Sequence, residues 1–147
     1  MKFQTNQKNQ TMKKTNQSIS GTSFHTITID TTPETLLAVA DKLQADYFEC
    51  NDGQDKVNFE FTFETSQGDV FTIYDWKYGH ELIMNERITF NIGSRDMSIA
   101  LTAKEELTKL IVEMQGDAVL DRYIKLDVSH QNWLDQIEKD NDITIIN

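Results

Sequence analysis

The sequence predicts an α+β fold, in which an antiparallel β-sheet, a meander of about four strands, has two or three helices packed on one face. Residues 57–64 alternate between apolar and polar side chains, as a half-buried strand does. Residues 33–46 and 98–114 repeat apolar side chains at helical spacing. The order strand–helix–strand–strand–strand–helix favours an antiparallel sheet. The length of 147 residues fits one domain, which we place at residues 23–147.

Residues 1–22 offer almost nothing to bury. They are mostly Gln, Asn, Thr, Lys and Ser, and such a composition cannot offset the entropy lost when a chain is ordered. We therefore expect a disordered polar tail over residues 1–22. Ordered structure is expected to begin at Phe24, because residues 24–29 alternate like a strand.

The first helix has a clear start. Thr32 can cap it, Pro33 suits the first helical position, and Glu34 complements the helix dipole. Four apolar residues then recur at helical spacing: Leu36, Ala40, Leu43 and Tyr47. We expect this helix to extend to about residue 46.

Three strands are expected to follow as a meander. One face of the first strand is apolar and comprises Val57, Phe59, Phe61 and Phe63. The turn residues at 66–69 separate this strand from residues 70–76, so the two segments predict a hairpin. Residues 88–92 are expected to add the third strand.

A second helix is expected close behind the third strand. Asp96 or Ser98 can cap it, and Gly116 stands where a helix-ending residue belongs. Its apolar stripe comprises Ala100, Ala103, Leu107, Leu110, Ile111 and Met114. Farther on, the pattern fits either a strand or a helix at 122–128, then a short amphipathic helix, and then an edge strand or docking segment at 142–146.

Charge is unevenly spread along the chain. Residues 1–20 hold four lysines and no acids, whereas residues 21–147 hold 10 basic and 24 acidic residues, a formal charge of −14. A body this acidic repels nucleic acid and membrane surfaces, so we expect neither as a direct partner. The acidity could favour a basic protein partner, for example by mimicking nucleic acid, or it could serve solubility alone.

A cytoplasmic location is expected. No apolar run approaches the roughly 18–20 residues that a membrane span needs. The first ten residues lack the apolar centre of a signal peptide. Cys50 is the single cysteine, which excludes an internal disulfide and fits a reducing compartment.

No catalytic residue, metal ligand or cofactor is predicted. His25, His80 and His130 lie far apart and outside metal-binding spacings. Cys50 lies near Glu49 and Asp52, and such acidic surroundings raise rather than lower the pKa of a thiol. No glycine-rich phosphate loop is present among the 6 glycines.

A partner-binding surface is expected where the second hairpin strand ends. It comprises Asp75, Trp76, Lys77 and Tyr78. Aromatic side chains at a strand end supply large, rigid contact area. The alternative is that Trp76 completes the core while Asp75 and Lys77 face water.

A ligand-binding site is expected where the third strand runs into the second helix. It comprises Arg87, Asn91, Gly93, Ser94 and Arg95. Free N–H groups and the dipole at a helix start attract anions, and the two arginines could converge there on a nucleotide or another small anion. The alternative is that Asp96 caps the helix and occupies those donors.

The chain resembles small proteins of tailed bacteriophages that carry an Ile-Tyr-Asp-Trp-Lys strand end and an Ile-Gly turn into a helix. Residues 73–77 and 92–93 carry these motifs, and the resemblance covers roughly residues 57–114. Ser94 departs from the pattern, which has a second glycine there. The resemblance implies a protein that binds a host factor in the host cytoplasm, including components of antiviral defence.

Our leading hypothesis is therefore a non-enzymatic accessory protein of phage type that binds and inhibits a host factor. A second is a small-molecule binder that sequesters a nucleotide signal at the turn around Gly93. A third is a structural or homo-oligomeric accessory protein. An enzyme is not expected.

Overall fold

A computed structural model describes residues 11–116 of the chain. By its internal contacts the chain divides into two compact units, residues 1–111 and 112–147. The first unit holds the sheet, and of the second only 112–116, the end of a helix, belong to the described residues. The single domain expected over residues 23–147 therefore stays a prediction. The segments expected at 122–146 lie outside the described residues.

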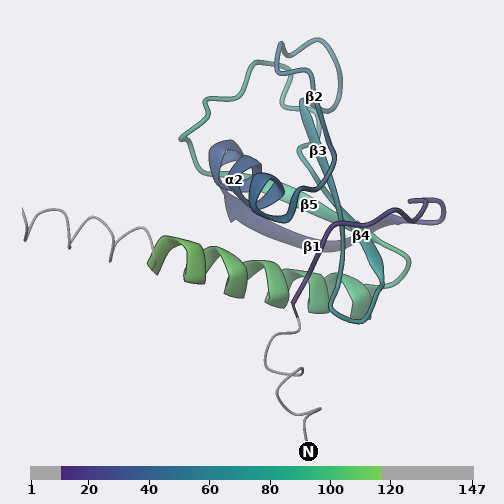
Figure 1. Cartoon of the computed structure of the whole chain (residues 1–147). Coiled ribbons are helices and arrows are strands. Elements are labelled where there is room, and N and C mark those ends of the chain that lie inside the picture. Colours follow the sequence, from purple (N-terminus) through teal and green to yellow (C-terminus); the bar gives the residue numbers. More distant parts are fainter. Residues whose placement is uncertain (1–10, 117–147) are drawn as a thin grey trace, which may run out of the picture. The chain divides into compact units, whose positions relative to one another are not determined.

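The fold is α+β, as the sequence predicts. One antiparallel sheet has the strand order β1-β5-β4-β3-β2 (Figure 1). Its strands are β1 (Ser23–Thr31), β2 (Tyr47–Glu49), β3 (Phe59–Glu64), β4 (Val70–Tyr74) and β5 (Ile88–Ser94). Strands β2 to β5 form the meander, and β1 adds to its far side beside β5. Two helices accompany the sheet: α2 (Pro33–Leu43) and a helix at 97–116, drawn in green.

The sheet has one apolar and one polar face. In β3 the side chains of Phe59, Phe61 and Phe63 are fully buried, and the residues between them are partly exposed. Paired residues in neighbouring strands lie on the same face, so Phe71 and Ile73, which pair with Phe63 and Phe61, continue the apolar face. The helices bury their apolar stripes against it. The other face carries more polar side chains and no helix of the described residues covers it, although Val70 and Thr72 of β4 are buried there.

Helix α2 begins as the sequence predicts and ends earlier. The hydroxyl of Thr32 accepts a hydrogen bond from the N–H of Thr35 at 3.1 Å, and Pro33 occupies the first turn. Gln44 has left-handed backbone angles and ends the helix. Tyr47 therefore lies in β2, so the expected continuation to residue 46 is wrong. Its ring stacks on Phe61 in the neighbouring strand, with the ring centroids 5.5 Å apart.

The second helix buries most of its predicted stripe. Within the first unit the buried side chains are Ala100, Ala103, Leu107, Leu110 and Ile111. Glu106 ties this helix to the β3–β4 turn, because its carboxylate accepts hydrogen bonds from the N–H and hydroxyl of Ser66 at 2.8 and 2.6 Å. Gly116 is still helical, so it is not the ending residue that the sequence suggests.

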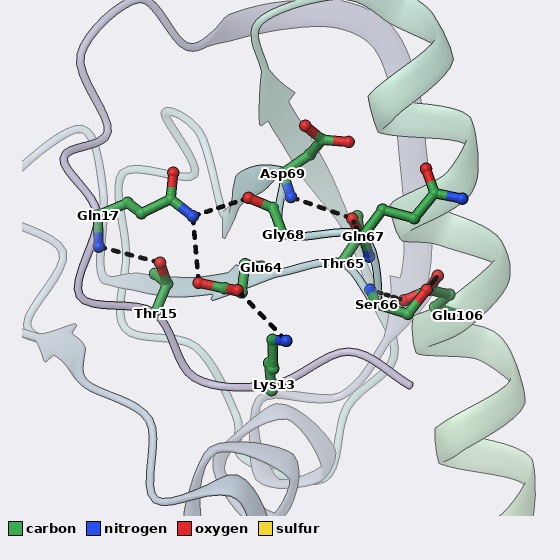
Figure 2. A network of polar contacts seen from close by, with 10 residues as sticks. All are labelled: Lys13, Thr15, Gln17, Glu64, Thr65, Ser66, Gln67, Gly68, Asp69 and Glu106. Carbon is green, nitrogen blue, oxygen red and sulfur yellow. Dashed lines mark hydrogen bonds and ion pairs between the residues drawn. The ribbon is translucent and has the colours of Figure 1, made fainter. Parts of the chain in front are cut away.

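Part of the expected disordered tail is ordered. Met12 is fully buried, and Lys13 exchanges two backbone hydrogen bonds with Glu64, at 2.9 and 2.8 Å. The amide of Gln17 donates to the Glu64 carboxylate and to the carbonyl of Gly68, as Figure 2 shows. The expectation of disorder is therefore wrong for residues 11–22, and the backbone of Lys13 pairs with β3 at Glu64, beyond the short β2. Residues 1–10 lie outside the described residues.

Candidate functional site

Two loops meet at one end of the sheet and position the candidate site. They are residues 50–58, between β2 and β3, and residues 75–87, between β4 and β5, and both lie at the top of Figure 1. The Asn51 side chain pairs with the backbone of Leu82, accepting at 2.7 Å and donating at 2.9 Å. Gly53 packs so closely on His80 that a Cβ on it would lie 2.6 Å from the His80 Cα. The loops therefore form one tightly packed unit.

A buried carboxylate lies beneath this pair of loops. Asp75 is 0% exposed and accepts hydrogen bonds from the N–H groups of Asn58 and Phe59 and from the Asn58 side-chain amide, at 2.7–3.1 Å. Asn58 in turn accepts from the N–H of Gly53 and donates to the carbonyl of His80. Asp75 is thus a structural residue, and its expected place on a partner-binding surface is wrong.

Trp76 points the other way and is 47% exposed. The ammonium groups of Lys77 and Lys56 lie 5.5 and 5.9 Å from the centroid of the Trp76 ring. Both distances are within reach of a cation–π interaction. We call Lys56, Trp76 and Lys77 the Trp76 site. Trp76 does not complete the core, and the site includes Lys56, which has no distinguishing pattern in the sequence.

Backbone strain brings the two lysines together. Lys77 has a φ of +56°, in the left-handed region that costs a non-glycine residue about 1 kcal/mol. Its N–H donates to the carbonyl of Lys56 at 2.7 Å, and this bond holds the strained turn. Strain of this kind gathers at functional sites, where neighbouring structure maintains it. The turn therefore sets two positive charges beside one exposed indole.

Tyr78 anchors the loop from the other side. Its hydroxyl donates to the carbonyl of Thr89 at 3.1 Å and accepts from the Thr89 N–H at 3.2 Å. These backbone groups lie beyond the end of β4, where β5 has no strand partner on that side. The role of Tyr78 is therefore to fix the loop, and Trp76 and Lys77 are the exposed members of the predicted surface.

The Trp76 site continues onto the polar face of the sheet. Trp76 meets the ring of Tyr74 edge-on, with centroids 6.2 Å apart. Tyr74 pairs with Glu60, and Glu60 pairs with Phe48, so these three side chains form a row across three strands. Phe48 is 50% exposed, and burial raises the pKa of the Tyr74 phenol. Tyr74 therefore adjoins the site, and the exposed Phe48 lies two strands away on the same face, with Glu60 between them.

The predicted anion site does not have the expected geometry. Ser94 is fully buried, its hydroxyl donates to the carbonyl of Asp96, and its own carbonyl contacts the His25 ring. Asp96 caps the helix by accepting from the N–H of Ile99 at 2.8 Å. Hydrogen bonds from Ile99 and then Ser98 lower the pKa of the Asp96 carboxyl, so a carboxylate already occupies the helix start.

The two arginines are not brought together. Arg87 precedes β5 and Arg95 follows it, so a strand of 7 residues, roughly 24 Å at about 3.4 Å per residue, separates them. The Arg95 guanidinium donates to the carbonyls of Ser18 and Ser20 and so holds the turn before β1. Gly93 is buried, and a Cβ on it would lie 2.6 Å from the Thr72 hydroxyl oxygen. Asn91 lies on the polar face, paired with Tyr74.

Residues 11–116 offer neither a candidate metal site nor a membrane-spanning helix. Over residues 11–116, no group of three His, Cys, Asp or Glu side chains could hold a metal ion. In the same stretch no helix has the length and apolarity needed to cross a membrane. The hydrogen bond and charge of Asp52 raise the pKa of the Cys50 thiol, as the acidic surroundings led us to expect.

No known protein family matches the chain, and neither a curated protein nor a solved structure matches it. Function is therefore inferred from the Trp76 site and its supporting loops.

Proposed function

We propose that this protein is a non-enzymatic binding protein that contacts a protein partner through the Trp76 site. As the resemblance to small phage proteins implies, the partner is a host factor, such as an antiviral-defence component. The protein inhibits this factor by binding it in the host cytoplasm. The contact is made by Trp76 and Lys77 with Lys56, and Asp75 and Tyr78 support it from behind.

The observation that carries the proposal is an exposed indole on a rigid support. Tryptophan is enriched among the residues that dominate binding free energy at protein interfaces. A rigid side chain also loses less conformational entropy on binding than one on a mobile loop. Trp76 directly follows the buried Asp75 and is half-exposed, so its position is set before any partner arrives.

A pull-down from bacterial lysate with the tagged full chain tests the proposal. We expect a protein that the wild type retains and Trp76→Ala loses. Leu101→Ala is the matched control, because Leu101 is equally exposed, at 50%, but lies on the helix at 97–116. The partner, once identified and purified, should lose its own activity when the wild type is added and keep it with Trp76→Ala. A partner that Trp76→Ala retains equally, or no retained partner, would contradict the proposal.

A further inference from the structure

We propose that the partner segment bound at the Trp76 site is acidic: a short stretch with carboxylate side chains beside an apolar one. This inference rests on the proposed function and concerns the same surface. It differs from the basic partner that is one of the two interpretations of the −14 body, the other being solubility alone. Contacts at an interface are governed by the charges that lie there, and those at the Trp76 site are positive.

The two lysines are left without an acidic partner in the described part of the chain. The one ion pair found between residues 11 and 116 joins Lys13 to Glu64, at 3.7 Å. The chain has 24 acidic residues, but none of those described forms an ion pair with Lys56 or Lys77. Instead the Lys77–Lys56 backbone hydrogen bond places two like charges beside the same ring. The repulsion between two like charges held close together is reduced when an anion binds between them.

The indole of Trp76 supplies the apolar part of the surface that the partner contacts. With the edge of Tyr74 beside it, the indole offers an apolar surface next to the two ammonium groups. Glu60 of β3 pairs with Tyr74 and borders this surface beyond it, so the carboxylates of the partner are placed at the lysines. An apolar side chain flanked by carboxylates satisfies both features at once. The carboxylates meet the lysines at the rim, and the apolar side chain covers the exposed part of the ring.

A single-stranded nucleic acid has the same two features, since bases stack on aromatic rings and phosphates bind lysines. The observations favour a peptide. A phosphate backbone places its charges close together along its whole length, so most of them would face the acidic remainder of the domain. A short peptide with one or two carboxylates is limited to the Trp76 site and meets far less of that repulsion.

Selection from a displayed library of random peptides tests the inference. The peptides are about ten residues long, the upper length of an ordinary strand. The full-length protein is the bait, and peptides that also bind Trp76→Ala are removed. We expect the remaining peptides to combine Asp or Glu with an apolar residue. Peptides that depend on Trp76 but are basic or uncharged would overturn the inference and leave the proposed binding function standing. A selection without any Trp76-dependent peptide would overturn it as well, and the lysate experiment then judges the function separately.

Charge variants with a selected peptide provide the decisive comparison. Replacing Lys56 and Lys77 together by Gln should weaken binding about ten-fold, which corresponds to about 1.4 kcal/mol, because the variant loses both positive charges that meet the carboxylates of the peptide. Lys104→Gln with Lys109→Gln is the matched control, since both lysines are exposed on the helix that covers the opposite face. Equal affinity for the two double variants would overturn the inference.

An oligothymidylate of matched charge is the competing probe. We expect no binding that depends on Trp76 and the two lysines. If the oligonucleotide binds in that way while the acidic peptides do not, the inference is overturned in favour of a nucleic acid.

Discussion

Asp75 and Trp76 are adjacent in sequence but have opposite environments. The carboxylate is buried under the backbone of the neighbouring strand, while the indole is half-exposed. A buried carboxylate without a nearby cation is costly unless hydrogen bonds satisfy it. Here the donors are the N–H groups of Asn58 and Phe59 and the Asn58 amide. The free-energy cost of burying a carboxylate is met at Asp75, the residue directly before Trp76. The stability of the loops is therefore connected to the position of the binding residue.

Asp75→Ala should destabilise the protein strongly. The change leaves three buried donors, the two N–H groups and the Asn58 amide, without their acceptor. Each unsatisfied donor costs about 1–3 kcal/mol, so we expect a loss of at least about 3 kcal/mol in the free energy of unfolding. Urea unfolding measures it. Asp55→Asn, in an exposed position of the neighbouring loop at 50–58, should change stability little. A loss below about 1 kcal/mol for Asp75→Ala would contradict this role.

A comparison of two glycines distinguishes the effect of backbone strain on stability from the effect of close packing. Gly53 and Gly79 have nearly the same φ, +74° and +73°, but a Cβ on Gly53 would meet the His80 backbone at 2.6 Å and a Cβ on Gly79 would meet nothing within 4 Å. Substitution by Ala at either position incurs about 1 kcal/mol for the left-handed backbone. Only Gly53→Ala also forces the loops apart, so thermal unfolding should show the larger loss for that variant. Equal losses would mean that the contact with His80 is unimportant.

At the scale of elements, strands β4 and β5 pack closely on the polar face, where the Thr72 side chain lies against Gly93. Gly93 pairs with Thr72 in the register, and a Cβ at Gly93 would lie 2.6 Å from the Thr72 hydroxyl oxygen. The chain therefore uses glycine in the middle of the sheet because the neighbouring side chain takes the space. This is a packing role, in contrast to the ligand-binding role that the sequence suggests for Gly93.

A double-mutant cycle tests this packing. Gly93→Ala should destabilise by about 1–3 kcal/mol, the usual effect of overpacking. Combining it with Thr72→Ala removes the obstructing hydroxyl, so the double variant should lose less stability than the two single changes added together. The expected coupling is at least about 0.5 kcal/mol, measurable by urea unfolding. Strict additivity would show that Thr72 and Gly93 do not limit each other.

At the scale of the whole molecule, local patterns predicted the elements and missed the long-range contacts. The alternation of Phe59, Phe61 and Phe63 identified β3, and Thr32 before Pro33 identified the start of α2. Strand β2 was missed because it has 3 residues and its Tyr47 lies at helical spacing from the helix before it. A strand this short has no period of its own to detect, and only pairing with β3 defines it.

In the candidate site, too, local sequence patterns were informative and long-range contacts could not be predicted. Trp76 and Lys77 could be proposed from the sequence because they are aromatic and charged at a strand end, and both are exposed. Asp75 was misplaced, because its hydrogen-bond donors lie 16 and 17 residues away and no local pattern reveals them. Lys56 was missed for the same reason, since it reaches Trp76 only through the loop pairing. Met12 likewise gave no signal, as a single apolar residue in a polar stretch.

Glu64 connects the N-terminal segment to the sheet, and its titration tests how much that segment matters. Hydrogen bonds from Thr15 and Gln17 and the charge of Lys13 lower the pKa of this carboxyl, although burial acts in the opposite direction. A lowered pKa means that the folded state favours the ionised form. Its contribution to stability is therefore complete above the ordinary pKa of 4.5 and is lost as the pH falls through the lowered value.

We therefore expect Glu64→Gln to be less stable than the wild type at about pH 7, and the difference to shrink below about pH 4.5. Urea unfolding of both proteins between about pH 7 and about pH 3 measures the difference. Glu105→Gln, an exposed change on the helix at 97–116, should follow the wild type throughout. Protection of the amides at residues 13–17, expressed relative to their intrinsic exchange rate at each pH, should fall in the same acidic range, because the contacts with Glu64 hold that backbone against β3. A difference that stays constant with pH would mean that the ionised carboxylate does not hold the segment in place.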